Sequence, residues 1–176
     1  VVGGGAAGFM AAITAAEAGV EGVEIWEATA EPLAKVRISG GGRCNVTHAC
    51  WDPSELVAHY PRGQRPLRGP FSRFAAGDAV AWFAERGVEL VEENDGRMFP
   101  VTNSSATVVA ALRAAAHRAG VKVQSQRALQ EVTPSTDGFL LQARGMSEPI
   151  RCRRLLLATG GHPSGRRIAA ALGHQV

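Results

Sequence analysis

The sequence predicts an α/β fold with a Rossmann-like nucleotide-binding domain, in which helices flank a parallel sheet and a small β-hairpin or meander is added. The first observation is the N-terminal order of an apolar dipeptide, a glycine-rich turn, an alanine-rich helix and an apolar strand. The second is the recurrence of short strands between helical segments along the 176 residues. We interpret residues 1–176 as one domain, long enough to bury a core.

The N-terminal elements predict the start of a βαβ unit. Val1-Val2 is expected to be the stub of a strand. Residues 6–18 are expected to be a helix because alanine is the best helix former, and Gly19 suits the end of that helix. Residues 23–26 are apolar enough for a strand buried in a parallel sheet.

The later elements follow from local composition. Residues 28–52 are expected to be mostly loop, residues 52–60 a short helix with Asp52 as N-cap, and residues 61–73 a connection rich in Pro, Gly and Arg. The remaining expected elements are helices at 76–87, 105–119 and 164–172, strands at 88–93, 121–125 and 153–158, an extended piece within 95–106 and a β-hairpin over 128–144.

The composition is that of a soluble globular protein, with 45% apolar residues, 20% charged residues and a net charge of +3. No basic stripe with interleaved aromatic residues is evident, so a small-molecule substrate is expected as partner rather than nucleic acid. No apolar run is long enough to span a bilayer, and no membrane partner is expected. The three cysteines argue against a secreted disulfide scaffold, so the cytoplasm is the expected location.

The scattered charged residues carry few functional signals. The five histidines show no metal-ligand spacing, and no metal site is expected. His48 and His162 are interpreted as structural, and Arg166 and Arg167 as solvated surface. The acids are expected to form a solvated strand end: Glu89, Glu92, Glu93 and Asp95.

The first glycine run predicts a dinucleotide site. Gly3, Gly5 and Gly8 fit the pattern G-x-G-x-x-G between a strand and a helix. In this pattern the first glycine permits the tight turn, the second lets a pyrophosphate approach the backbone, and the third lets helix and strand pack closely. Glu27, at the end of the next strand, is the expected acceptor for ribose hydroxyls, and Glu24 is the competing acid.

The second glycine run, SGGGRCNVTH, also indicates a ligand. Three successive glycines leave backbone N–H groups free to curl around an anion or a ring edge. Arg43 is a candidate to neutralise phosphate, and Asn45 and Thr47 are candidates for hydrogen bonds. The competing interpretation is a flexible loop.

Four motifs occur in one order along the whole chain: GGGAAG, K-x-R-I-SGGGRCN-x-T, GRMFPVT and LLLATGG. Together they resemble the bacterial NAD(P)/FAD-dependent oxidoreductases described as aminoacetone-oxidase-like or BaiN-like flavoproteins, of the glutathione-reductase-like FAD superfamily. The resemblance implies a Rossmann-type FAD-binding domain. Because members of this family are longer, an inserted substrate domain and a C-terminal segment that closes over the flavin are expected after Val176.

The resemblance also implies which residues contact FAD. The turn and the ribose acid match the diphosphate and adenosine side, residues 96–100 match a loop near the flavin ring, and Arg37 competes with Lys35 for the role of the family's lysine. The implied cofactor-binding residues are Gly3, Gly5, Ala6, Ala7, Gly8, Glu27, Ala28, Lys35, Ser39, Gly40, Gly41, Gly42, Arg43, Cys44, Asn45, Val46, Thr47, Ala128, Ala158, Thr159, Gly160 and Gly161.

The resemblance implies an FAD-dependent oxidoreductase that transfers hydride between NAD(P)H, or a small organic substrate, and FAD. No catalytic residue stands out, although Arg43 and the N–H groups near Gly40–Gly42 are candidates to stabilise negative charge on the reduced flavin. One alternative is a thiol-disulfide flavoenzyme that uses Cys44 and Cys50. The other is a nucleotide-binding module without turnover.

Overall fold

The computed structural model describes residues 1–176, and the chain divides into two compact units. Unit 1 combines residues 1–34 with residues 112–176, and unit 2 consists of residues 35–111. Unit 2 is therefore inserted into the sequence of unit 1. No helix combines the length and the apolar character that crossing a lipid bilayer requires.

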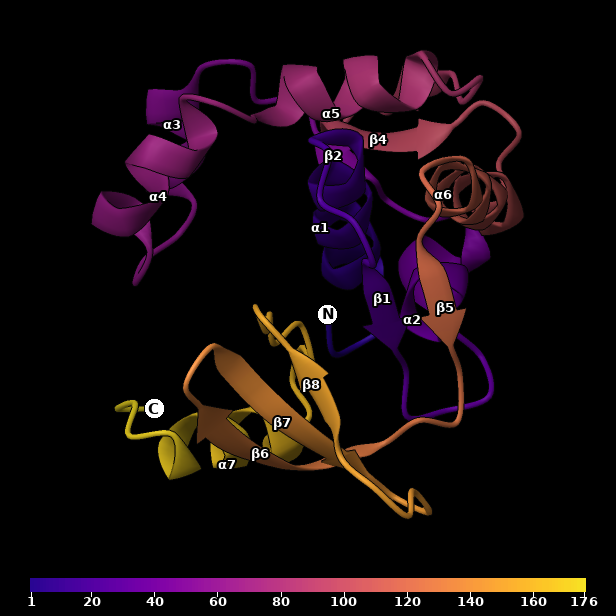
Figure 1. Ribbon diagram of the computed structural model, residues 1–176. Coiled ribbons are helices and arrows are strands. Elements are labelled where there is room, and N and C mark those ends of the chain that lie inside the picture. The colour runs from indigo at the N-terminus through magenta and orange to yellow at the C-terminus, as the bar shows by residue number, and fades with distance from the viewer. The chain divides into compact units, whose positions relative to one another are not determined.

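Unit 1 contains the parallel sheet that the sequence predicts. Strand β1 (Glu24–Trp26) pairs in parallel with strand β5 (Lys122–Gln124), and the two arrows run side by side in Figure 1. Val2 forms parallel bridges to Trp26 and Leu157, so the order in space is Leu157, Val2, β1, β5. This order of parallel segments is Rossmann-like, and the predicted fold class is confirmed.

Helix α1 (Ala6–Glu17) follows the Val2 segment directly, within one residue of the expected helix. Its alanines favour the helical backbone, and Phe9 and Ile13 are buried on the side that packs toward β1. The helix ends just before Gly19, as predicted. The N-terminus of α1 therefore lies at the carboxyl end of the Val2 segment, where ligands bind in open parallel sheets.

The rest of unit 1 is an antiparallel sheet with a helix against it. Strands β6 (Leu129–Ser135) and β7 (Gly138–Ala143) form the predicted hairpin, and β8 (Ile150–Cys152) pairs with the other edge of β7. Helix α7 (Pro163–Ala171) lies beside this sheet in Figure 1 and contacts β6. A buried apolar cluster joins these elements to the parallel sheet: Val2, Trp26, Leu129, Leu141, Ala143 and Ile168.

The expected strand over residues 153–158 is mostly wrong. Only Leu157 forms a bridge, and Leu156 is 44% exposed. The reason is that residues 150–152 belong to β8 of the antiparallel sheet, so residues 153–155 carry the chain across, and pairing with Val2 is limited to the two hydrogen bonds on either side of Leu157. The sequence shows an apolar run here but not this change of sheet.

Unit 2 is built around a small antiparallel sheet with the order β2-β4-β3. Met98 and Phe99 on the central strand are buried and form its core, and α5 contacts both outer strands. The elements of unit 2, of which α2 and α6 extend into unit 1, are α2 (Ala34–Ile38), β2 (Thr47–His48), α3 (Pro53–Ala58), α4 (Gln64–Phe71), α5 (Ala76–Ala84), β3 (Leu90–Glu92), β4 (Arg97–Pro100) and α6 (Ser105–Arg118).

Two segments expected as loop or connection contain helix. Residues 28–52 include α2 and a 3₁₀ turn at Ser39–Gly42, and residues 61–73 include α4. Pro66 is tolerated in α4 because it lies in the first turn, where the backbone N–H has no partner within the helix. α4 also packs against α3, and this tertiary contact outweighs its weak helix propensity.

Candidate functional site

The glycine turn of unit 1 depends on two of its glycines for steric reasons. Gly3 has φ +109°, and a Cβ atom there would lie 2.4 Å from the carbonyl oxygen of Ala158. A Cβ atom on Gly8 would lie 1.9 Å from the carbonyl oxygen of Gly3. Both distances are far below van der Waals contact, so the turn itself excludes side chains at these two positions.

Gly5 differs from both. It has φ −88° and ψ −173°, an extended conformation that any residue adopts, and a Cβ atom there would meet nothing within 4 Å. Gly5 is the N-cap of α1, and the exposed Ala6 and Ala7 begin the helix. The fold therefore does not require a glycine here, and its effect is to keep open the space before a helix N-terminus that attracts anions.

Glu27 ties this turn to the loop after β1. Its Oε2 atom accepts the N–H of Gly4 at 2.8 Å, and its Oε1 atom accepts the N–H and the hydroxyl of Thr29, each at 2.8 Å. Burial alone would raise the pKa of Glu27, but these hydrogen bonds outweigh it and hold the pKa below its ordinary value. The ionised carboxylate has about four acceptor positions, so it retains capacity for a ligand hydroxyl.

The loop that follows Leu157 lies against the same turn. The N–H of Ala158 donates to the carbonyl of Val2 at 2.8 Å. Thr159 packs onto Gly165 of α7, and Gly160 and Gly161 are exposed. The structure thus brings the glycine turn, Glu27 and residues 158–161 together in unit 1, at the carboxyl ends of parallel segments.

Ala28 and Ala128 lie in the loops that follow β1 and β5. Ala28 is exposed between Glu27 and Thr29. Arg127 donates its N–H to the carbonyl of Glu27 at 2.7 Å, which holds the two loops together, and the carbonyl of Ala128 accepts the N–H of Arg144 at 3.0 Å. Each alanine directly follows one of the two residues that the Arg127–Glu27 hydrogen bond joins, and their contact with the adenosine part of a cofactor stays a prediction.

The second glycine run, in unit 2, forms a tight left-handed turn. Gly40 and Gly41 have φ +55° and +68°, and Cys44 also adopts a positive φ of +63°. A Cβ atom on Gly40 would lie 2.8 Å from both the backbone nitrogen of Asn45 and a ring carbon of Phe99. Because the N–H of Cys44 donates to the carbonyl of Ser39 at 3.0 Å, the segment is an ordered turn rather than a flexible loop.

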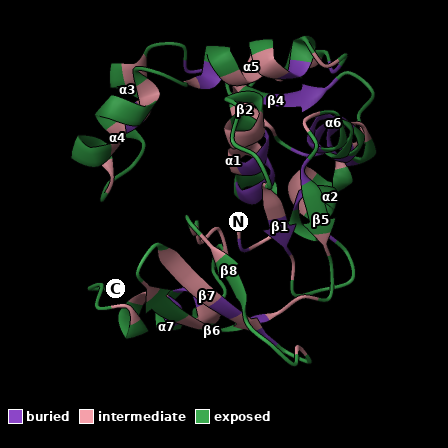
Figure 2. Cartoon of the chain, in the orientation of Figure 1, coloured by how far each residue is buried: buried purple, intermediate pink, exposed green.

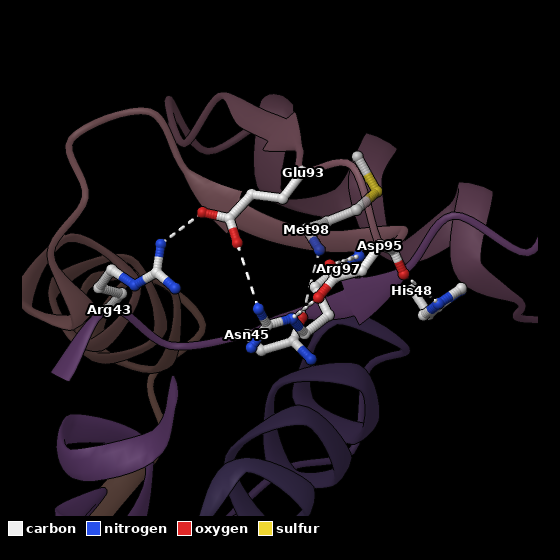
Figure 3. A network of polar contacts seen from close by, with 7 residues as sticks. All are labelled: Arg43, Asn45, His48, Glu93, Asp95, Arg97 and Met98. Atoms are coloured by element: carbon white, nitrogen blue, oxygen red, sulfur yellow. Dashed lines mark hydrogen bonds and ion pairs between the residues drawn. The ribbon is translucent and has the colours of Figure 1, made fainter. Parts of the chain in front are cut away.

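Arg43 is held by two partners in unit 2. Its guanidinium lies 3.9 Å from the centre of the Phe99 ring, and its Nη1 atom is 2.5 Å from Oε1 of Glu93. Glu93 also pairs with Arg97 at 3.5 Å, and Arg97 pairs with Asp95 at 2.7 Å (Figure 3). Glu93 and Asp95 follow the end of β3 and keep side chains that are 36% and 55% exposed, and in addition both take part in this ion-pair network.

The residues after Arg43 lie along strand β4. The Oδ1 atom of Asn45 accepts the N–H of Met98 at 3.2 Å (Figure 3), the N–H of Val46 donates to the carbonyl of Met98 at 2.9 Å, and Thr47 is opposite Met98 in the sheet. Two motifs, SGGGRCN and GRMFP, are thus joined in unit 2. Lys35 and Arg37 are both exposed on or beside this segment and have no side-chain partner in the chain.

Sequence reasoning missed Glu93, Arg97 and Phe99 as supports of Arg43. Phe99 lies within the GRMFPVT motif, which is the one signal that could have indicated it. Glu93 is fifty positions from Arg43, and no local pattern predicts such a pair. His48 and His162 have structural partners as expected: His48 lies 3.1 Å from the carbonyl of Asp95, and His162 caps α7.

The thiols do not resemble a redox pair. Cys44 and Cys50 are buried and not bonded to each other. Burial raises the pKa of Cys44, and for Cys50 the carboxylates of Glu55 and Asp52 add to the same effect of burial. A thiolate is the reactive form, so these surroundings do not favour thiol-disulfide chemistry. No group of three or more His, Cys, Asp and Glu side chains is arranged to hold a metal ion.

Curated relatives match this chain over almost all of its length. The chain is 30% identical over 183 residues to the 3-dehydro-bile acid delta(4,6)-reductase of Clostridium scindens, covering 99% of the chain and 43% of that protein. It is 27% identical over 184 residues to the ribosomal RNA dihydrouridine synthase of Escherichia coli, covering 100% of the chain and 44% of that protein. The chain therefore spans less than half the length of these curated relatives.

Solved structures share the fold at low identity. The 3-ketosteroid-delta4-(5alpha)-dehydrogenase from Rhodococcus jostii RHA1 superimposes with a TM-score of 0.60 at 17% identity, over 87% of this chain and 43% of that one. The THI4 protein of Thermovibrio ammonificans gives 0.53 at 15% identity, over 85% and 51%. The family model described as the HI0933-like protein Rossmann domain matches residues 1–176, in agreement with the resemblance carried by the four motifs. The chain therefore belongs to the HI0933-like protein Rossmann domain family.

Proposed function

We propose that unit 1 binds FAD at the glycine turn and that the whole protein is an FAD-dependent reductase. One observation carries this proposal: Gly5 leaves the N-terminus of α1 open although the fold tolerates a side chain there. A diphosphate would fill this space, because backbone N–H groups and the helix dipole favour an anion at this point.

The residues around the turn fit the remaining parts of such a cofactor. The Glu27 carboxylate is ionised, fixed by Thr29 and Gly4, and able to accept a further hydrogen bond from a ribose hydroxyl. Residues 158–161 lie beside Gly3 and would line the opposite side of the diphosphate. We propose, from the family resemblance, that Ser39–Thr47 contacts the flavin end of FAD.

Arg43 would serve the flavin end through its positive charge. Glu93 and Phe99 fix its guanidinium, so a ligand would meet a charge that is already oriented. Since the Arg43 side chain is 30% exposed, it can also contact a bound molecule without leaving these partners. This supports electrostatic stabilisation of a reduced cofactor by Arg43, while no residue is assigned as catalytic acid or base.

The reaction class is proposed from what the relatives' names share. A delta(4,6)-reductase and a dihydrouridine synthase both add hydrogen to a carbon–carbon double bond. FAD, held by the glycine turn and Glu27, would supply hydride transfer from NAD(P)H to one carbon of the double bond, and a proton from solvent would complete the addition at the other carbon. A uracil base in RNA and a steroid-like ring are then the two candidate substrates.

Purification of the full-length protein tests this proposal. We expect a yellow protein whose flavin, released by denaturation, is identified by mass as FAD in a ratio near one per chain. We also expect NAD(P)H to bleach the flavin absorbance under anaerobic conditions. Colourless protein that binds only ADP or NAD would overturn the proposal and would instead indicate a nucleotide-binding module without turnover.

A further inference from the structure

Helix α4 and the residues beside it carry an unpaired basic surface. Arg62, Arg65, Arg68 and Arg73 lie close together in the sequence, and no acidic residue occurs between His59 and Gly77. All four arginines are exposed, and no hydrogen bond or ion pair of the chain involves their side chains. We call these four residues the arginine surface.

The helix places its charged and apolar side chains on different sides. Arg65 and Arg68 are three residues apart, which puts their Cβ atoms about 5–6 Å from each other on one face. Leu67 and Phe71 are half-buried against the chain: Leu67 lies over Gly63, and the ring of Phe71 is 5.4 Å from that of Tyr60. The rest of α4 is exposed, as Figure 2 shows in green.

This surface suits a polyanion with planar rings. Arginine presents a planar fork of donors that matches phosphate oxygens, and neighbouring arginines without acids repel each other until an anion neutralises them. Tyr60 and Phe74, which are 44% and 43% exposed, lie on either side of the arginines in the sequence, and exposed aromatic rings stack on unpaired bases. An anionic membrane is a poorer match, because the apolar residues of α4 face the protein rather than the solvent.

We propose that the arginine surface binds the phosphate backbone of RNA and so selects a uracil-bearing RNA as the substrate class. For the reduction of the uracil ring this proposal rests on the proposed reductase function, and for the binding of RNA it rests on the arginine surface. The sequence alone predicts no nucleic acid partner, because no basic stripe with interleaved aromatic residues is evident in it. The formation of α4 changes that premise, because it collects Arg65 and Arg68 on one face.

The test uses the full-length flavoprotein and a fluorescein-labelled, uridine-rich single-stranded RNA, followed by fluorescence anisotropy over a range of salt concentrations. For Arg65→Gln with Arg68→Gln we expect the slope of log binding constant against log salt concentration to become shallower by about 1.4. Each of the two lost phosphate contacts contributes about 0.7 on a single strand. At 0.1 M salt this corresponds to roughly 25-fold weaker binding, if binding at 1 M salt is unchanged. Arg166→Gln with Arg167→Gln removes the same charge from exposed positions of α7 and is the matched control, expected to bind RNA nearly as the parent does.

Each outcome decides the proposal. Unchanged RNA binding by the α4 variant, an equal loss in the α7 control, or binding to phosphatidylserine vesicles in place of RNA would each overturn it. Circular dichroism monitors folding, and Arg62→Gln with Arg73→Gln, which leaves α4 intact, replaces the first variant if that one unfolds. The ratio of flavin to protein chain is measured in every sample. Absence of flavin from all samples, the parent included, would contradict the reductase function, whereas the change in RNA binding tests the arginine surface alone.

Discussion

Replacing Gly5 with valine separates ligand binding from folding. A Cβ atom at Gly5 meets nothing within 4 Å, and the extended φ and ψ suit a β-branched residue, so the backbone accepts a side chain here in the free protein. Valine is a poorer N-cap than glycine, at a cost of about 0.5–1.5 kcal/mol. This is small beside the roughly 5–15 kcal/mol that stabilises a domain, so we expect the variant to fold.

The same substitution should abolish cofactor retention. The valine side chain would occupy the space before the first N–H groups of α1, and a diphosphate would lose about two charge-assisted hydrogen bonds of roughly 1.5–3 kcal/mol each. A loss of about 3–6 kcal/mol corresponds to roughly 10²- to 10⁴-fold weaker binding. Purified Gly5→Val protein should therefore contain little flavin while its urea midpoint remains near that of the parent.

Gly3→Ala and Gly8→Ala provide the contrasting controls. In each variant the new Cβ atom would lie too close to a backbone carbonyl oxygen, at 2.4 Å for Gly3→Ala and 1.9 Å for Gly8→Ala. Both substitutions should therefore lower the free energy of unfolding as well as the flavin content. The assay is the ratio of flavin to protein absorbance, measured together with urea unfolding of each variant. A Gly5→Val protein with parental flavin content and affinity would refute the assignment of the turn as the diphosphate site.

Three further predictions concern other residues. The folded pKa of Glu27 lies below its ordinary value of about 4.3, so the contribution of Glu27 to stability is present above that pH and is lost as pH falls through the folded pKa. The difference in unfolding free energy between the parent and Glu27→Gln should therefore shrink in acid, and a constant difference from about pH 7 to about pH 3 would contradict this prediction. Cys44 and Cys50 should react slowly with iodoacetamide at pH 7 and rapidly in urea, because burial raises the pKa of both thiols, and rapid native labelling would argue against this. Glu93→Gln removes the partner of Arg43 and should cost about 0.2–1 kcal/mol at low salt and less at 1 M salt, as urea titrations at the two salt concentrations would measure.

The Rossmann part of the fold could be predicted because its signals are local. Alanine-rich α1, the apolar β1 and the turn between them lie within one short stretch, and each has its own chemical reason. Helix α4 could not be predicted in this way, because Pro66 and Pro70 lower its intrinsic propensity and its contact with α3 supplies what propensity lacks.

In the candidate site, too, local features could be predicted from the sequence and contacts between distant segments could not. The spacing of Gly3, Gly5 and Gly8 predicts a turn, but only the structure separates the two glycines that the fold requires from the one that it does not. Likewise, the position of Glu27 predicts an acid near a ribose, whereas its bonds to Gly4 and Thr29 depend on how two loops meet. Contacts between distant segments carry no periodic signal, so composition and spacing cannot indicate them.

The three hydrogen bonds accepted by Glu27 also limit how this domain can be re-engineered. A common route to a different nucleotide preference is to exchange the acid that follows the second strand. Here that exchange would release the amide of Gly4 and the loop at Thr29 at the same time, so a designer would alter specificity and dismantle the turn in one step. A library that keeps Glu27 and varies the exposed Ala28 and Ala30 would leave this scaffold whole.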